Sequence, residues 1–398
     1  MNEPVTSLSV GSRVRAGVAT WVVVLVALRL LVLQPERCDP PTVAEVEESA
    51  VAAVNWFVRN QNLDGTWLYR YNVETNMDLG GYNLSRHSGV TLSLYQAAAA
   101  GIPGAWESAE RGSRYLAGLL VAANDGRAVN EQGSEVAIGP SALWALALGE
   151  RRLTTGDPAY DDVLRDLGRF LEGQIEENGA VSERWDRSAD RLVPGAYSPF
   201  FTGEAYFALA RLERLFPDER WEGAADRVGR YLAVERDEAE DRFPAVSDHW
   251  AAYGLAETAR WRALTAAEAD YAGRLGGIFG PQIRYASQRT ESWFTHRTRG
   301  RRTLGAGLGT LGEGTTSLWV LAGIEPAAGD LRAAAGERSA CVAAMLIERQ
   351  IDPTEARAYE DARRSAGSWV QFGVTQMDDQ QHALSALLRT LPILEAAL

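Results

Sequence analysis

Apolar residues recur at helical spacing along most of the chain. Thr42 and Glu45 form a capping box, and Val46, Val54 and Phe57 follow on one helical face. A second such pattern begins after Asp157-Pro158, with apolar residues at Val163, Leu164, Leu167, Phe170 and Leu171. No run of alternating β-branched residues is long enough to predict a sheet. The pattern therefore indicates an all-α chain.

The first strongly apolar segment lies at the N-terminus. Arg13 and Arg15 precede an uncharged run over residues 16–28, and the apolar segment continues past Arg29 to residue 33. A segment of roughly 18–20 apolar residues can span a bilayer, and Arg29 lies near enough to one end to snorkel outward. Arginines before the segment and acidic residues after it predict a cytoplasmic N-terminus.

These features predict the division of the chain. We expect a cytoplasmic tail at 1–15, a transmembrane anchor or signal segment at 16–34, and one domain at 42–398 outside the cytoplasm. No small-x-small cleavage site follows the apolar run, which favours a single-pass membrane anchor over a cleaved signal peptide.

The remaining chain repeats one design, a polar or glycine turn followed by an alanine- and leucine-rich helix. Successive helices start about 45 to about 69 residues apart, close to one helical hairpin per repeat. Six hairpins predict a closed toroid with six inner and six outer helices. An open solenoid is the alternative, but no distinctly polar capping repeat is present. The six predicted inner helices begin near His87, Pro140, Glu204, His249, Glu313 and His382.

The segment from Gln61 to Trp67 looks like the Gln-Trp repeat motif of the squalene-cyclase group. Together with the hairpin repeat, it makes residues 42–398 resemble the (α/α)6 toroid superfamily. That superfamily includes six-hairpin glycosidases, sugar epimerases, polysaccharide lyases and the terpene cyclase/prenyltransferase group. The Asp-x-Asp-Asp motif of the cyclases is absent, with Met377-Asp378-Asp379 nearest to it, and so is the prenyltransferase Asp/Cys/His zinc set. These departures count against isoprenoid chemistry.

Charge and cysteine content narrow the function further. The 398 residues carry a formal net charge of −13, which argues against a general nucleic-acid binder. The two cysteines, Cys38 and Cys341, form no metal-type pair and can make one disulfide at most. We predict no cofactor and no metal site. A mixed site built from His87, Asp248, His249 and His382 is conceivable, but no ligand spacing specifies it.

The candidate chemistry gathers where the predicted inner helices begin. In a closed toroid these starts surround one mouth of the cavity. Buried carboxylates with raised pKa values can serve as general acids beside an ionised partner, and glycosidic cleavage needs such a pair. Each residue taken alone could instead cap a helix. The candidate catalytic residues are Glu204, Asp248, Asp378, His87, His249 and His382.

One of these histidines gives the most specific prediction. Gly80-Gly81 allows a sharp turn into the first inner helix, and Asn83, Arg86 and His87 then share one helical face. A face with these side chains needs polar partners if it is buried. We therefore expect His87 to face the cavity, within reach of the carboxylates near Asp248 or Asp378.

Aromatic and basic residues supply candidate binding groups. Aromatic rings suit the apolar faces of sugars, and arginines bind carboxylate, phosphate or sulfate groups in a bidentate manner. Arginines crowd the loop before the fifth inner helix, at 284, 289, 297, 299, 301 and 302, where a solvated loop is the plainer interpretation. The candidate substrate-binding residues are Tyr69, Tyr82, Asn83, Arg86, Trp250, Glu313 and Arg297.

The sequence thus predicts a membrane-anchored extracytoplasmic carbohydrate-active enzyme. Its ligand would be a glycan, including one with anionic groups, or another polar small molecule, and its reaction that of a glycoside hydrolase, lyase or epimerase. The alternative is a non-catalytic toroid that binds a glycan or a partner beside the membrane. The sequence does not indicate an oligomeric state.

Overall fold

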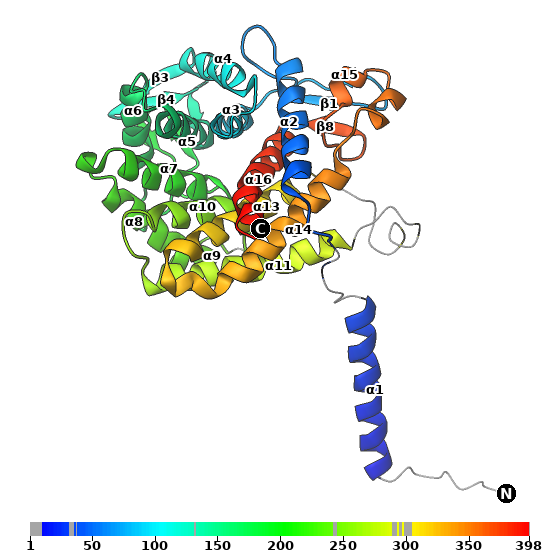
Figure 1. The fold of residues 1–398 in the computed structure, drawn as a ribbon. Coiled ribbons are helices and arrows are strands. Elements are labelled where there is room, and N and C mark those ends of the chain that lie inside the picture. The colour runs from blue at the N-terminus through cyan, green and yellow to red at the C-terminus, as the bar shows by residue number, and fades with distance from the viewer. Residues whose placement is uncertain are drawn as a thin grey trace, which may run out of the picture.

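The computed structural model describes residues 10–31, 36, 38–130, 133–241, 245–288, 293, 297 and 305–397. The first described helix, α1 (Val10–Leu31), is drawn apart from the remaining helices in Figure 1. Its apolar side chains are largely exposed, with Trp21 at 68%. Over the described residues, no helix meets the length and apolarity needed to cross a membrane, so the predicted transmembrane segment is unsupported.

The domain is a closed ring of helical hairpins. Within the described residues, each inner helix contacts the next inner helix along the chain, and the last contacts the first. Blue α2 and red α16 accordingly lie side by side in Figure 1. The closed toroid is therefore confirmed over the open solenoid. The inner helices are α3 (Leu84–Ala99), α5 (Ile138–Thr155), α7 (Phe201–Leu215), α10 (His249–Thr258), α13 (Gly305–Ile324) and α16 (Met377–Glu395).

The outer helices cover the seams between neighbouring inner helices. For example, α4 contacts both α3 and α5, and α14 contacts both α13 and α16. One outer helix, α8, continues through a π-helical turn, η2 (Tyr231–Glu235), into α9 (Arg236–Ala239). The outer helices are α2 (Val43–Arg59), α4 (Ala105–Ala117), α6 (Asp161–Glu172), α8 (Glu222–Arg230), α11 (Ala266–Ser287) and α14 (Arg332–Arg349).

Capping explains where two of the outer helices begin. The predicted capping box is present at α2. The Thr42 side chain accepts a hydrogen bond from the Glu45 amide, and the Glu45 carboxylate accepts one from the Thr42 amide. Thr265 and Glu268 repeat the same arrangement at α11. The remaining short helical elements are η1 (Pro217–Glu219), η3 (Pro326–Leu331), η4 (Glu355–Ala358) and α15 (Ala362–Ser365).

The expectation of an all-α chain is wrong in one respect, because short strands connect the helices. They form sheets with strand orders β2-β1-β8, β3-β4 and β5-β6-β7. The strands are too short to show an alternating pattern: β2 has 2 residues and β3 has 4. Their bounds are β1 (Arg70–Asn72), β2 (Met77–Asp78), β3 (Leu120–Ala123), β4 (Gly126–Val129), β5 (Glu135–Ala137), β6 (Arg184–Asp186), β7 (Arg191–Leu192) and β8 (Val374–Gln376).

The turns after α2 and α6 share a glutamine and a glycine. Gln61 Nε2 donates to the carbonyls of Gly65 and Ser108, which ties the turn to α4. Gly65 has φ 99° and Gly179, in the equivalent turn, has φ 91°. A Cβ on Gly179 would lie 2.5 Å from the Arg227 carbonyl oxygen. Each turn therefore packs its glycine against the backbone of the next outer helix.

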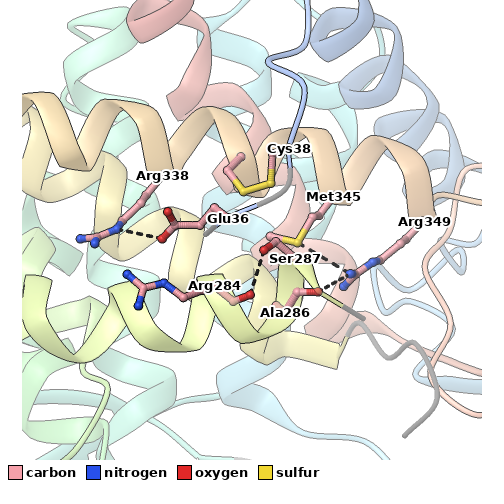
Figure 2. The surroundings of a disulfide bond; sticks show 9 residues. Glu36, Cys38, Arg284, Ala286, Ser287, Arg338, Met345 and Arg349 are labelled. Carbon is pink, nitrogen blue, oxygen red and sulfur yellow. Dashed lines mark hydrogen bonds and ion pairs between the residues drawn. A yellow bond between two sulfur atoms is a disulfide. The ribbon is translucent and has the colours of Figure 1, made fainter. Parts of the chain in front are cut away.

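A disulfide joins Cys38 to Cys341, with the two Cα atoms 5.0 Å apart (Figure 2). Cys341 lies in α14, so the bond ties the segment ahead of α2 to the last outer helix. An ion pair between Glu36 and Arg338, at 3.5 Å, adds a second link to α14. The pairing that the sequence left open is thus present.

Candidate active site

The structure brings most of the predicted polar residues together where the inner helices α7, α10 and α16 begin, beside Glu313 from within α13. Glu204 lies in the first turn of α7, Asp248 caps α10, and His249 is the first residue of α10. Asp378 lies in the first turn of α16, with His382 one turn later. Glu313, from α13, contacts both His249 and His382. We call Glu204, Asp248, His249, Glu313, Asp378 and His382 the polar cluster.

His382 is held by a buried carboxylate. Its Nδ1 lies 2.5 Å from Oε2 of Glu313, and its Nε2 lies 3.6 Å from Oδ1 of Asp378. The Tyr253 hydroxyl donates to the other Glu313 oxygen, at 3.2 Å. Burial lowers the pKa of His382, but the attraction and hydrogen bond of Glu313 outweigh it and raise the pKa to about 9. His382 is therefore an imidazolium at neutral pH.

His249 lies beside that imidazolium but has the opposite character. It is 2% exposed, and within the described part of the chain neither ring nitrogen has a hydrogen-bond partner. Its Nε2 lies 3.6 Å from Oε2 of Glu313, outside hydrogen-bond distance. Burial, then repulsion from His382, lowers the pKa of His249 well below 6.5. His249 is therefore a neutral imidazole at neutral pH, and both of its ring nitrogens lack a hydrogen-bond partner among the described residues.

Asp248 is fully engaged in structural bonds. Its Oδ1 accepts the Ala251 amide at 2.9 Å, and its Oδ2 pairs with Nη1 of Arg236 at 2.5 Å. Burial raises the pKa of Asp248, and the Arg236 guanidinium opposes that rise. Gly203 provides the room, because a Cβ there would lie 2.5 Å from Oδ1 of Asp248. Asp248 thus offers no free oxygen to a substrate.

Glu204 is the cluster's candidate acid. It is 4% exposed, and its Oε2 has no hydrogen-bond partner among the described residues. Burial, followed by repulsion from Asp248, raises its pKa to about 8. Glu204 therefore keeps its proton at neutral pH and can donate it.

Asp378 and Arg86 form the more exposed edge of the cluster. Nε of Arg86 lies 3.4 Å from Oδ2 of Asp378, with 32% and 18% of the side chains exposed. Nη1 of Arg86 also donates to the Tyr69 hydroxyl at 2.5 Å. Arg86 and Tyr69 thus lie beside the polar cluster.

The predicted placement of His87 is wrong. Its Nδ1 is bonded to the Tyr82 hydroxyl at 2.7 Å, and its Nε2 to the Gly112 carbonyl of α4 at 3.0 Å. The ring packs against Trp67 and Tyr115 and is fully buried. Burial lowers the pKa of His87 to about 4. Its polar partners lie between α3 and α4, so it reaches neither Asp248 nor Asp378.

Three other predicted binding residues, Asn83, Tyr82 and Trp250, make contacts within the protein that stabilise the fold. Asn83 is the N-cap of α3 and accepts the Arg86 amide, and the Tyr82 hydroxyl accepts the Trp67 amide. Trp250 is 3% exposed and lies against His249, with ring centroids 4.5 Å apart. Arg297 is exposed, and the arginines at 289, 299, 301 and 302, like His296, lie outside the described residues.

His249, Glu313 and His382 are also residue types that bind metal ions, and their ligand atoms lie within 4.8 Å of one another. Two ligands of one zinc ion stand roughly 3.3 Å apart, given bonds of about 2.0 Å in a tetrahedron. The 2.5 Å separation of His382 Nδ1 and Glu313 Oε2 instead fits a hydrogen bond.

Sequence reasoning missed Arg236 as part of the site. Tyr253 lies four residues after His249 in α10, on the same side of that helix. Arg236 follows the π-helical turn η2, and no pattern in the sequence predicts that its side chain reaches Asp248.

No protein-family model matches the chain, and no curated protein matches its sequence. Solved structures do match. Cellobiose 2-epimerase from Spirochaeta thermophila has TM-score 0.61 at 13% identity, over 88% of this chain and 97% of its own. An α-1,6-mannanase of Salegentibacter, solved with α-1,6-mannotriose, has TM-score 0.60 at 12% identity, over 88% and 99%. A D-mannose isomerase has TM-score 0.55 at 12% identity, over 88% and 96%.

These likenesses define the fold class. The chain has the (α/α)6 toroid fold of the epimerase and mannanase structures, and the whole length of each is matched almost completely. At these identities the likeness shows the fold alone.

Proposed function

We propose that the protein is a carbohydrate-active enzyme of the epimerase or isomerase type, with His249 and His382 as its base and acid. One observation carries the proposal: two buried imidazoles, with ring centroids 5.0 Å apart, have pKa values shifted in opposite directions. Titratable neighbours whose pKa values are pushed apart are the usual signature of an acid–base pair.

The chemistry follows from these protonation states. Neutral His249 removes the proton from the carbon next to a sugar carbonyl; the electron pair of that C–H bond forms a C=C bond, and the carbonyl π pair moves to the oxygen to give an enediolate. For epimerisation the His382 imidazolium returns a proton to the opposite face of the same carbon, and the carbonyl re-forms. For isomerisation it protonates the former carbonyl carbon, while the proton of the neighbouring hydroxyl passes to the former carbonyl oxygen and a new carbonyl forms. Glu313 stays ionised and holds the His382 ring in place.

The substrate class is a reducing sugar or short oligosaccharide. Arg86, Asp378 and Tyr69 offer hydroxyl-binding groups at the exposed edge of the cluster. The solved structures of similar fold include a cellobiose 2-epimerase and a D-mannose isomerase, which supports a sugar as substrate.

A second candidate function is glycoside hydrolysis. Glu204 favours it, because a buried carboxyl with a pKa of about 8 and a free oxygen can protonate a leaving group. Its partner would be Asp378, since both oxygens of Asp248 are already bonded.

Incubation with reducing sugars in heavy water, followed by NMR, tests the first proposal. An epimerase or isomerase exchanges the proton next to the carbonyl for deuterium, whereas a hydrolase releases new reducing ends and exchanges none. His249→Asn and His382→Asn should abolish exchange, and Glu204→Gln should spare it. A folded protein that binds sugars without exchange or cleavage would instead support the non-catalytic toroid.

We also propose that the domain lies outside the cytoplasm, attached to a membrane through its N-terminal segment. The Cys38–Cys341 disulfide supports the location, because such bonds persist in oxidising compartments. The exposed apolar side chains of α1 support the attachment. Fractionation of cells expressing the full chain and a chain starting at Pro40 tests the attachment: the first should be in the membrane fraction and the second should not.

A further inference from the structure

A cavity lies at the opposite end of the ring from the polar cluster. It has a volume of about 320 Å³ and is lined from α5, α7, α10, α13 and α16. Arg389 of α16 lies seven residues beyond His382, and Arg211 seven beyond Glu204, which is roughly 10 Å along each helix. We call this space the arginine cavity.

The arginine cavity carries an excess of positive charge. Its lining holds four arginines, Arg211, Arg214, Arg260 and Arg389, but only two carboxylates, Glu150 and Glu257. This imbalance stands out in a chain whose net charge is −13.

The two carboxylates are shared among three of the arginines. Glu257 accepts Nε of Arg211 at 2.8 Å and Nη1 of Arg214 at 3.1 Å, and it lies 3.7 Å from Arg260. Glu150 pairs with Arg211 at 3.1 Å. Burial lowers the pKa of Arg260, and although Glu257 opposes this, the other arginines lower it further. The cavity's positive charge is therefore only partly neutralised.

Arg389 has no carboxylate partner within the described chain. Its Nε and Nη2 donate to the hydroxyls of Thr316 and Ser317, at 3.3 and 3.2 Å, and its guanidinium lies 4.3 Å from the Tyr253 ring centroid. These contacts hold the guanidinium in a fixed orientation at the cavity without supplying a counter-charge.

Helix geometry alone does not account for this arrangement. The cavity lies towards the C-terminal ends of the inner helices, where cations are favoured. Arg211 and Arg214 satisfy that preference and are also paired with carboxylates. Arg389 lies inside α16, well before Glu395, so it does not cap the end of its helix.

We propose that the arginine cavity binds a small oxyanion, a phosphate or carboxylate group, with Arg389 and Arg260 as its ligands. Guanidinium groups bind such anions through paired N–H donors. The cavity volume leaves room for a group attached to the anion, such as a sugar. Tyr253 lies between this site and the polar cluster, because its ring contacts the Arg389 guanidinium and its hydroxyl donates to Glu313. The proposal does not depend on the proposed function.

Calorimetric titration of the full chain at low ionic strength tests this inference. Inorganic phosphate, acetate, glucose 6-phosphate and glucuronate distinguish phosphate from carboxylate, and free anion from sugar acid. We expect saturable binding of at least one of them, weakened at least tenfold by Arg389→Gln and by Arg260→Gln. Arg230→Gln is the control, because Arg230 is exposed on α8 and outside the cavity.

Arg260 is exposed, so Arg260→Gln should fold and still tests the proposal if Arg389→Gln fails to fold. No saturable binding by the unaltered protein would overturn the proposal. Binding that survives Arg260→Gln and Arg389→Gln in folded protein, or that Arg230→Gln weakens equally, would overturn it too.

Discussion

Oε2 of Glu313 lies 2.5 Å from Nδ1 of His382 and 3.6 Å from Nε2 of His249. One buried carboxylate oxygen thus stands between two imidazoles and hydrogen-bonds to only one of them. The His382 ring, bonded to Glu313, gains a positive charge. The His249 ring is buried beside that charge and has no hydrogen-bond partner among the described residues. The opposite pKa shifts of the two histidines follow from this asymmetry.

The pH dependence of activity should reflect this pair. Activity needs neutral His249, whose pKa lies well below 6.5, and protonated His382, whose pKa is about 9. We expect kcat/KM to be level between about pH 6.5 and about pH 8 and to fall as His382 loses its proton near pH 9. Glu313→Gln should move this alkaline fall to lower pH, because it removes the main cause of the raised pKa. An alkaline limit unchanged in Glu313→Gln would contradict the assignment.

Glu204 should make stability fall as pH rises. Its folded pKa is about 8 against 4.5 in the unfolded chain, so between these values only the folded state holds the proton. This contribution is fully present below about pH 4.5 and is lost by about pH 8, at a cost on the order of a few kcal/mol. Glu204→Gln should therefore lose less stability than the unaltered protein between about pH 5 and about pH 8 in urea denaturation.

Glu48→Gln is the matched control for that measurement, since Glu48 is exposed on α2. It should leave the pH dependence of unfolding unchanged. Equal slopes for the unaltered protein and Glu204→Gln would show that Glu204 is ionised in the folded state.

His87 should matter for stability more than for catalysis. His87→Ala removes two buried hydrogen bonds and leaves a cavity between Trp67 and Tyr115, which should cost about 2–4 kcal/mol of unfolding free energy. His382→Ala should instead lower kcat by about 10²–10⁴-fold. Denaturation and kinetics on both variants separate the roles. A His87→Ala protein of full stability but without activity would restore His87 to the catalytic site.

The fold was accessible from the sequence because the ring repeats one design. Helical spacing, capping residues and turns recur in each hairpin, so an error in one predicted helix boundary does not change the predicted toroid. Pro140 and Glu204 lie within the first turn of their helices, and His249 begins its helix. Glu313, in contrast, lies well inside α13. Its helix start was predicted wrongly because nothing in the apolar, glycine-rich sequence of α13 marks where that helix begins.

The site was only partly accessible for a physical reason. A residue at a helix start is expected near the mouth of a toroid, and Glu204, Asp248 and His382 do lie near the starts of their helices and close to one another. Whether a side chain points inward depends on helix rotation, which periodicity defines poorly when a helix is buried all round. The α3 helix is buried in this way, so the inward prediction for His87 failed while Arg86, one residue earlier, lies at the cluster.

The glycine turns predict a paired effect on stability. Gly179→Ala must strain a φ of 91° and also push a Cβ against the Arg227 carbonyl oxygen. Gly156, the C-cap of α5, has φ 72° with nothing within 4 Å of its Cβ position, so Gly156→Ala carries the backbone strain alone. We expect a loss of about 1 kcal/mol for Gly156→Ala and at least twice that for Gly179→Ala. Equal losses in urea denaturation would contradict the backbone contact.

The disulfide should stabilise the seam where the ring closes. The first and last outer helices, α2 and α14, contact each other there, and Ser49 of α2 donates to Gln350 just after α14. Cys38 and Cys341 span the same seam at a sequence separation of 303, so the bond closes a loop of about three quarters of the 398-residue unfolded chain. Chain-entropy arguments give a contribution of about 3–5 kcal/mol for such a loop.

Reduction should therefore lower Tm, and the Cys38→Ser/Cys341→Ser double variant should show the same lowered Tm with or without reductant. Denaturation of both proteins with and without dithiothreitol makes the comparison. Because the inner ring is closed by α16 against α3 independently of the disulfide, the reduced protein should keep its helical content at low temperature. A Tm unaffected by reduction would mean that these packing contacts, and not the covalent link, hold the first and last hairpins together.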